Sequence, residues 1–81
     1  MQATRWVVHM AAVGGYLGRN DKTAQNWGTV VQDLQIAYKA VSPENAEDHA
    51  THLRSGWKGK RYPDARVREV FQDRDGQWHM V

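Results

Sequence analysis

Hydrophobic and polar positions along the chain predict one helix set among short strands. The strongest signal lies in residues 34–53, where an alternating segment leads directly into SPENAEDHATHL. Ser42 suits a helix N-cap, Pro43 fits the first helical position, and Glu44 follows in the first turn. Gly56 provides a C-terminal stop. This stretch therefore predicts a strand followed at once by a helix.

The two faces of the predicted helix differ in hydrophobicity. Ala46, Ala50 and Leu53 recur at helical spacing and form a thin inward stripe, with His49 at its border. Because alanines let the helix lie close to a sheet, large residues of the strands must supply most of the core volume. The residues expected to face water are Glu44, Glu47, Asp48, Thr51 and His52.

Residues 4–13 are dense in apolar positions and predict a largely buried first strand. Gly14 and Gly15 then end the strand or turn it. One side of this strand carries Trp6, Val8, Met10 and Ala12, and the other carries Arg5, Val7, His9 and Ala11.

Residues 16–28, YLGRNDKTAQNWG, show no sustained period and predict a long connection. Long loops without secondary structure are uncommon in compact domains and are often functional. We therefore regard this loop as a candidate partner-binding surface; the alternative is a packed excursion between two strands. Its candidate binding residues are Tyr16, Arg19, Asn20 and Lys22.

Residues 29–41 fit two interpretations. A helix is suggested by Thr29 and Gln32, which imitate a capping box, and by hydrophobic residues at helical spacing. A strand is suggested by the alternation in residues 34–40. A helix would also have to end at Ser42 and restart at once, because a residue before proline disfavours the α region. We therefore favour a strand from residue 30 or 31 onward, while a helical start stays open.

The C-terminal part predicts a hairpin. Residues 65–73 resume as a strand, and Asp75-Gly76 is a strong signal for a two-residue turn. With that turn, Phe71, Trp78 and Met80 share one face with Val67. The expected cross-strand pairs are Asp73–Trp78, Phe71–Met80 and Val70–Val81.

Together these elements predict an α+β fold in the order β-β-α-β-β, with one helix packed on one face of a small antiparallel sheet. The chain of 81 residues forms a single domain, 1–81. An open sheet face or an edge strand is a natural binding surface, and an edge strand allows a homodimer. The face expected to be partly open carries Val7, His9, Val70 and His79.

Composition is that of an ordinary small soluble domain. The formal net charge is +2, with basic and acidic residues interspersed, and the chain contains no cysteine. The absence of cysteine excludes disulfides and thiolate metal ligands and fits a reducing compartment, so we expect a cytoplasmic protein. No apolar run is long enough to span a bilayer, so we expect no membrane association.

Motifs for catalysis or metal binding are weak. His49 and His52 lie three positions apart on the predicted helix, and His9 or His79 could complete a metal site, but no specific ligand spacing supports it. No serine stands in a nucleophile motif, and glycine motifs for phosphates or dinucleotides are missing. We therefore expect no metal, no cofactor and no enzymatic activity.

The best functional signal is the basic-aromatic segment RSGWKGKRY, residues 54–62. Its basic side chains could contact phosphates while an aromatic ring stacks on a base. A solvated loop, with aromatic residues that cap the helix end, explains the same pattern. The candidate nucleic-acid or partner-binding residues are Arg54, Trp57, Lys58, Lys60, Arg61 and Tyr62.

Several motifs of the C-terminal half resemble those of a known group of proteins. Ala-x-Ser-Pro-Glu-x-Ala-x-x-x-Ala is followed by Pro-x-Ala-x-Val-x-x-Val and by a Gly-x-Trp hairpin; the residues concerned are Ala40, Ser42, Pro43, Glu44, Ala46, Ala50, Pro63, Ala65, Val67, Val70, Gly76 and Trp78. This pattern resembles small β-β-α-β-β proteins of phages and mobile elements, among them some anti-CRISPR inhibitors of type I complexes.

The resemblance implies a non-catalytic phage-type protein that blocks or redirects a host protein or nucleoprotein complex. We therefore expect a small binding protein that acts by surface occlusion. The alternative is direct binding of DNA or RNA through residues 54–62.

Overall fold

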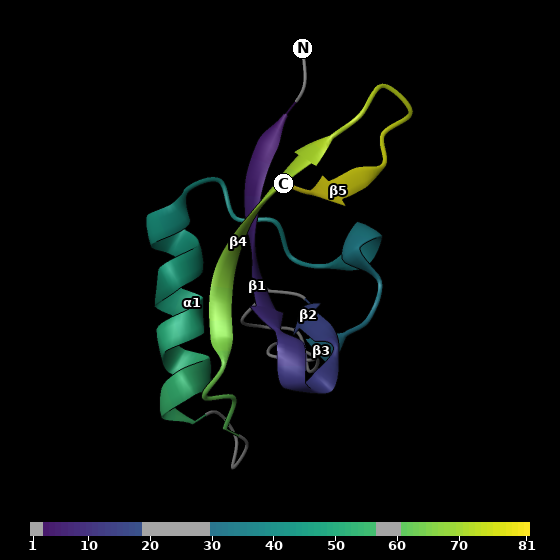
Figure 1. Ribbon diagram of the computed structural model, residues 1–81. Helices are drawn as coiled ribbons and strands as arrows, with labels where there is room; N and C mark the ends of the chain where they lie inside the picture. Colours follow the sequence, from purple (N-terminus) through teal and green to yellow (C-terminus); the bar gives the residue numbers. More distant parts are fainter. Residues whose placement is uncertain (1–2, 19–29, 57–60) are drawn as a thin grey trace.

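The computed structural model describes residues 3–18, 30–56 and 61–81 (Figure 1). In chain order, with η for a 3-10 turn, the elements of these ranges are β1 (Thr4–Met10), η1 (Ala11–Val13), β2 (Gly15–Leu17), β3 (Val30–Val31), η2 (Leu34–Ile36), α1 (Pro43–Ser55), β4 (Ala65–Gln72) and β5 (Trp78–Met80).

The strands form one antiparallel sheet in the spatial order β3-β2-β1-β4-β5, and α1 packs against its central pair, β1 and β4 (Figure 1). The predicted class, an α+β fold with one helix on one face of an antiparallel sheet, is confirmed. The sheet also contains β2, which the sequence pattern did not predict.

The helix begins and ends where the sequence predicts. The Ser42 hydroxyl accepts a hydrogen bond from the Asn45 N–H at 3.1 Å, and Pro43 opens the first turn. At the other end Gly56 has φ 117°, and its N–H donates to the His52 carbonyl at 3.0 Å. Both ends of α1 are therefore satisfied by local contacts.

The core beneath α1 combines small helix residues with larger strand residues. Ala46, Ala50 and Leu53 are buried, as predicted, and the side chains expected to face water are exposed. The buried partners on the strands and beside them are Val8, Met10, Leu17, Ala40 and Ala65. The predicted inward stripe of the helix is thus confirmed.

The first strand is shorter than predicted. It ends at Met10, and η1 follows, closed by a hydrogen bond from the Gly14 N–H to the Ala11 carbonyl at 3.1 Å. Gly14 has φ 66°, a conformation that favours glycine, and the chain reverses there into β2. The Asp64 carboxylate accepts a hydrogen bond from the Ala12 N–H at 2.7 Å and ties η1 to the start of β4.

The strand predicted from residue 30 or 31 to residue 41 is wrong for most of its length. Val30–Val31 pairs with β2 as β3, and η2 replaces the alternating segment that follows. Thr29, on which the helical alternative depended, lies outside the described residues.

Polar side chains hold η2 from both ends. The Asp33 carboxylate accepts a hydrogen bond from the Gln35 N–H at 2.9 Å, and Lys39 Nζ donates to the Leu34 and Gln35 carbonyls, each at 2.6 Å. Burial lowers the pKa of Lys39, and the nearby Asp33 opposes that shift. Because these local contacts satisfy the backbone, this segment needs no partner strand.

Residues 38–40 fill the place beside β1 that the short β2 leaves open. Trp6 and Ala40 exchange two backbone hydrogen bonds, 3.1 Å from Trp6 N to Ala40 O and 2.7 Å from Ala40 N to Trp6 O. The Tyr38 N–H donates to the Leu17 carbonyl at 2.9 Å. The chain thereby passes from η2 on one side of the sheet to α1 on the other (Figure 1).

The β4–β5 hairpin is shifted by one residue from the predicted register. The Asp73 N–H donates to the Gln77 carbonyl at 2.9 Å, so residues 74–76 form a three-residue turn with Gly76 at φ 82°. Turns of this length typically end in a glycine with positive φ. The observed pairs are Val70–Met80, Phe71–His79 and Gln72–Trp78, and each predicted pair is wrong by one position.

The register shift places side chains of β5 on the opposite faces from those predicted. Directly opposed residues share a face, so His79 lies with Phe71, and their rings stack with centroids 5.3 Å apart. Trp78 and Met80 lie on the other face, with Val70.

The sheet face opposite α1 is partly covered. Val7 and Val70, which were expected on a partly open face, are fully buried. The residues that pack with them are Tyr16, Val31, Leu34, Ala37, Trp78 and Met80. His9 stays on this face and is half-buried, whereas His79 does not belong to it.

Candidate nucleic-acid interface

The register of β1 and β4 gathers basic side chains on the sheet face opposite α1. Directly opposed residues project to the same side of a sheet, and so do residues two apart on one strand. The observed pairs are His9–Arg66, Val7–Arg68 and Arg5–Val70. We call the group formed by Arg5, His9, Arg66 and Arg68 the basic face.

Within the described residues, no acidic side chain forms an ion pair with the arginines of the basic face. Glu69 is the acidic residue of the described strands, and it projects to the opposite face. Asp64, just before β4, is engaged by the N–H of η1 described above. Within the described residues, Arg66 and Arg68 are exposed and form no ion pair with a carboxylate.

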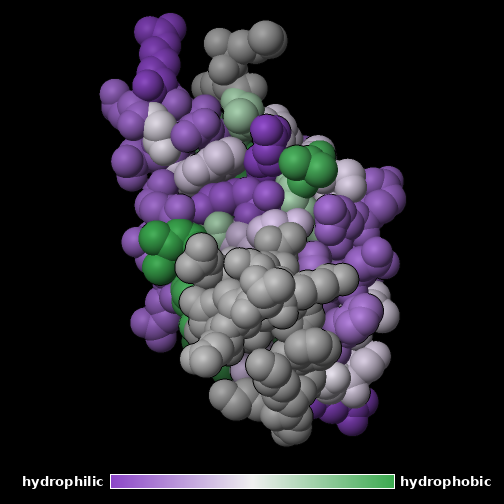
Figure 2. Space-filling model, turned by 180° about the vertical axis from the view of Figure 1, so that it is seen from behind, coloured by the Kyte–Doolittle hydropathy of each residue, from purple (hydrophilic) through white to green (hydrophobic). Residues whose placement is uncertain are grey.

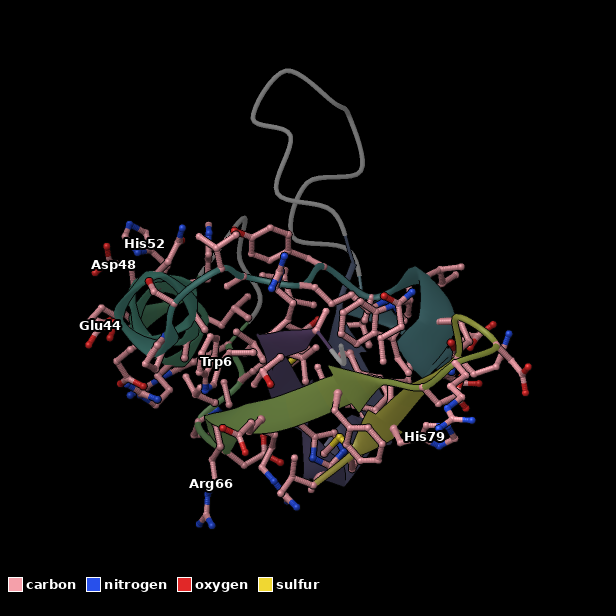
Figure 3. The ribbon with its side chains drawn as sticks, turned by 90° about the horizontal axis from the view of Figure 1, so that it is seen from above. Trp6, Glu44, Asp48, His52, Arg66 and His79 are labelled. Atoms are coloured by element: carbon pink, nitrogen blue, oxygen red, sulfur yellow. The ribbon has the colours of Figure 1, made fainter. Side chains whose placement is uncertain are left out.

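The basic face and the acidic surface of α1 point in different directions. Figure 3 shows Arg66 projecting away from the helix, while Glu44, Asp48 and His52 lie on the outer side of α1. Trp6 lies between the helix and the sheet in the same view. An anionic partner would therefore be attracted to one side of the molecule and repelled from the other.

Arg5 and Tyr16 border the basic face. One nitrogen of the Arg5 guanidinium donates to the Thr4 carbonyl at 2.7 Å, which leaves further N–H groups for other acceptors. The Tyr16 ring stacks on His9 with centroids 4.9 Å apart and 30° between the ring planes. Tyr16, predicted from the sequence as a partner-binding residue, is therefore brought beside the basic residues.

The predicted residue Arg54 is occupied by contacts within the chain. Its guanidinium donates to the Ala65 carbonyl at 2.8 Å and to the Thr51 hydroxyl at 3.2 Å, and it pairs with the Glu47 carboxylate. These contacts tie the end of α1 to the start of β4. Arg54 therefore makes contacts within the chain that stabilise the junction between α1 and β4.

The remaining residues of segment 54–62 divide between described and undescribed parts of the chain. Arg61 is exposed, and its Nε donates to the Arg54 carbonyl at 3.1 Å. Tyr62 is half-buried against the core under α1, and its N–H donates to the Leu53 carbonyl at 2.9 Å. Outside the described residues lie Trp57, Lys58 and Lys60 of this segment and Arg19, Asn20 and Lys22 of the first loop.

The histidines that suggested a metal site are spread over different contacts. His49 packs edge-on against Tyr38, with centroids 5.1 Å apart, and His52 Nδ1 lies 2.9 Å from the Asp48 carbonyl. His79 Nε2 lies 2.6 Å from a carboxylate oxygen of Asp73. In the part of the chain that the structure describes, no group of three potential ligands converges on one point.

The arginines of the basic face were not among the residues that the sequence pattern singled out. In the predicted strand of residues 65–73, Arg66 and Arg68 alternate with apolar residues. In the predicted first strand, Arg5 and His9 lie on the same side. Each alternation was visible in the sequence. Their convergence was not, because it depends on β1 pairing with β4 across about sixty positions of the chain.

Exposed hydrophobic residues are scattered over the described surface. Seen from behind, the coloured residues are mostly hydrophilic, and hydrophobic ones show as separate spots (Figure 2). The exposed large ones, Val13, Ile36, Val41 and Val81, belong to different segments of the chain. The described surface therefore concentrates charge more clearly than hydrophobicity.

Comparisons with known proteins identify no relative of this chain. No family model, curated protein or solved structure matches the chain. Among the described residues, no helix has the length and apolar character needed to cross a bilayer.

Proposed function

We propose that this protein is a non-catalytic binding protein that docks on a host nucleoprotein complex and occludes it. The observation that carries the proposal is the basic face, where Arg5, Arg66 and Arg68 project from one side of the sheet and form no ion pair with a carboxylate of the described residues. Unpaired arginines on one face form a suitable docking surface for a partner with dense negative charge.

The composition of this surface supports a nucleic-acid-bearing partner over a purely protein one. Protein–protein interfaces are depleted of charged residues at their centre and rely on apolar or aromatic anchors. Here the central apolar residues, Val7 and Val70, are fully buried beneath neighbouring side chains. On β1 and β4, the exposed residues of this face are Arg66 and Arg68, and a charged surface is typical of protein–nucleic acid interfaces.

The resemblance of the C-terminal half to small proteins of phages and mobile elements supports the biological setting. In that setting the protein acts by covering a working surface of a host complex, as an anti-CRISPR-like inhibitor would. The proposal requires no catalytic step and no cofactor.

Capture experiments test this proposal. The tagged full chain is used as bait in host lysate over a series of salt concentrations, beside the double variant Arg66→Gln/Arg68→Gln. Arg74→Gln serves as the matched control, because Arg74 is an exposed arginine in the β4–β5 turn, off the basic face. We expect the wild type and the control to retain a stoichiometric complex that contains nucleic acid, and the double variant to lose it.

Two results would contradict the proposal. One is the absence of any stoichiometric partner at every salt concentration. The other is equal retention of the complex by the wild type and the double variant.

A second candidate is direct nucleic-acid binding through residues 54–62. The observation that favours it is the exposed side chain of Arg61, next to the half-buried ring of Tyr62. The triple variant Lys58→Ala/Lys60→Ala/Arg61→Ala tests it. Unchanged nucleic-acid affinity in this variant removes the candidate, whereas a loss that the double variant does not share favours it.

A homodimer through an edge strand is a third arrangement. At β5, such a dimer would have to displace the Gln35 side chain, which bonds both backbone groups of Trp78. Light scattering at increasing protein concentration tests it: a constant monomer mass argues against the dimer.

A further inference from the structure

We propose that the basic face binds the phosphodiester backbone of a single-stranded nucleic acid, laid along the paired strands β1 and β4. This inference rests on the proposed function and names the part of the nucleoprotein partner that the protein contacts. It is carried by the order in which the basic side chains follow one another along the sheet.

Each pair of directly opposed β1 and β4 residues on this face contains one arginine, and we call each such pair a row. The first row holds Arg66 opposite His9, the second holds Arg68 opposite Val7, and the third holds Arg5 opposite Val70. Successive rows are two residues apart, which is roughly 7 Å along an antiparallel strand. The three arginines therefore succeed one another along the strand direction, two on β4 and one on β1.

This spacing suits an extended polynucleotide. Two residues of a polypeptide and one nucleotide of a nucleic acid contain the same number of backbone bonds, so their extended repeats are similar in length. A single strand that passes Arg66 and Arg68 of β4 and reaches Arg5 of β1 can therefore present one phosphate to each arginine. Guanidinium groups suit this task, because their planar donors bind phosphate oxygens in pairs.

The shape of the surroundings favours one strand over a duplex. The arginines come from β1 and β4, adjacent strands about 4.8 Å apart, so the charged strip is narrow. On the β5 side the same face is occupied by Trp78 and Met80, which pack with η2. On the β2 side the stacked ring of Tyr16 borders the strip.

Fluorescence anisotropy with labelled oligo-dT and oligo-U of equal length tests the inference. The phosphodiester chain is common to both probes, and their relative affinity shows whether DNA or RNA is preferred. With three phosphate contacts to a single strand, the logarithm of the affinity should fall with the logarithm of the salt concentration with a slope of about −2. Arg66 and Arg68 should account for roughly −1.4 of this slope.

The double variant Arg66→Gln/Arg68→Gln is expected to bind both probes about 25-fold more weakly at ~0.1 M salt, because two contacts are removed. Its salt slope should be shallower than that of the wild type by about 1.4. Arg74→Gln should match the wild type in affinity and slope. Because Arg66 and Arg68 are exposed, the double variant should also keep the wild-type unfolding curve.

Three results would overturn the inference: no binding of either probe, equal binding by the wild type and the double variant, or tighter binding of a duplex of the same length. Failure of the inference can be told apart from failure of the proposed function. If the probes do not bind but the double variant still loses the captured complex, the inference alone falls. If the double variant also captures the complex fully, both fall.

Discussion

The side-chain amide of Gln35 forms hydrogen bonds with both the backbone N–H and the backbone carbonyl of Trp78. Gln35 Oε1 accepts from the Trp78 N–H at 2.7 Å, and Gln35 Nε2 donates to the Trp78 carbonyl at 2.9 Å. The neighbouring hydrogen bonds of Asp73 with Gln77 and of Val81 with Glu69 show that alternate residues of β5 face β4. Trp78 therefore presents its backbone groups to the free edge of the sheet, where Gln35 takes the place of a further strand.

Replacing Gln35 by alanine should destabilise the fold. Two hydrogen bonds between η2 and β5 are lost at a solvent-exposed edge, so we expect the free energy of unfolding to fall by about 1–2 kcal/mol. Urea denaturation measures the change. Gln32→Ala is the matched control, an exposed glutamine of the same connection, and should change stability by less than about 0.5 kcal/mol. Equal effects of the two substitutions would show that the amide contacts contribute nothing to stability.

The three-residue turn of the hairpin depends on the backbone conformation of Gly76. Its φ of 82° is costly for residues with a Cβ, although an added Cβ would meet only a side-chain atom of Gln72, 3.7 Å away. Gly76→Ala should therefore lower the free energy of unfolding by roughly 1–2 kcal/mol through backbone strain alone. Gly76→Asn should cost less, because asparagine tolerates this conformation. Thermal unfolding of both variants decides the matter, and an alanine variant as stable as the asparagine variant would contradict this explanation.

Asp73 makes the stability of the hairpin dependent on pH. The hydrogen bond with His79, followed by backbone N–H groups of Gln77 and Asp75, holds the pKa of Asp73 below the usual aspartate value. The folded state therefore binds this proton less readily than the unfolded state, so the stabilisation is present above about pH 4 and is lost as pH falls through the lowered pKa.

Asp73→Asn should remove that part of the acid dependence. The difference in unfolding free energy between the wild type and this variant should shrink as pH falls below about 4. Asp75→Asn is the control, because it removes a carboxylate from the same turn and keeps the backbone N–H that donates to Asp73. A constant difference between wild type and Asp73→Asn across the acid range would argue against the linkage.

Arg54 should matter for stability and not for nucleic-acid affinity. Arg54→Ala removes the hydrogen bond to the Ala65 carbonyl, and we expect a loss of about 1–1.5 kcal/mol in urea denaturation. Glu47→Ala removes only the exposed ion-pair partner and should cost less than about 0.5 kcal/mol. Anisotropy with oligo-dT should show an unchanged salt slope for Arg54→Ala. A slope shallower by about 0.7 would instead assign Arg54 a phosphate contact.

The parts of the fold that could be predicted from the sequence are those fixed by neighbouring residues. Ser42, Pro43 and Gly56 act within one turn of the helix ends, so the bounds of α1 were readable. The hairpin was foreseen because Asp75-Gly76 is a local signal. Its register was missed because the two-residue and three-residue turns share that signal and differ only in where the strands pair.

The parts that could not be predicted depend on distant residues. The alternation in residues 34–40 suggested a strand, but Lys39 and the contact of Gln35 with Trp78 hold the first part of it as η2. The basic face also depends on distant residues, because Arg5 and Arg68 become neighbours only through the pairing of β1 with β4. The loop candidates outside the described residues stay predictions: Arg19, Asn20, Lys22, Trp57, Lys58 and Lys60.

The most direct test of the basic face is an NMR titration of the ¹⁵N-labelled full chain with oligo-dT. We expect the largest shift changes on β1 between residues 5 and 9, on β4 between residues 66 and 68, and on the side-chain Nε–H signals of the arginines in these ranges. Shift changes confined to residues 54–62, with β4 unmoved, would contradict it.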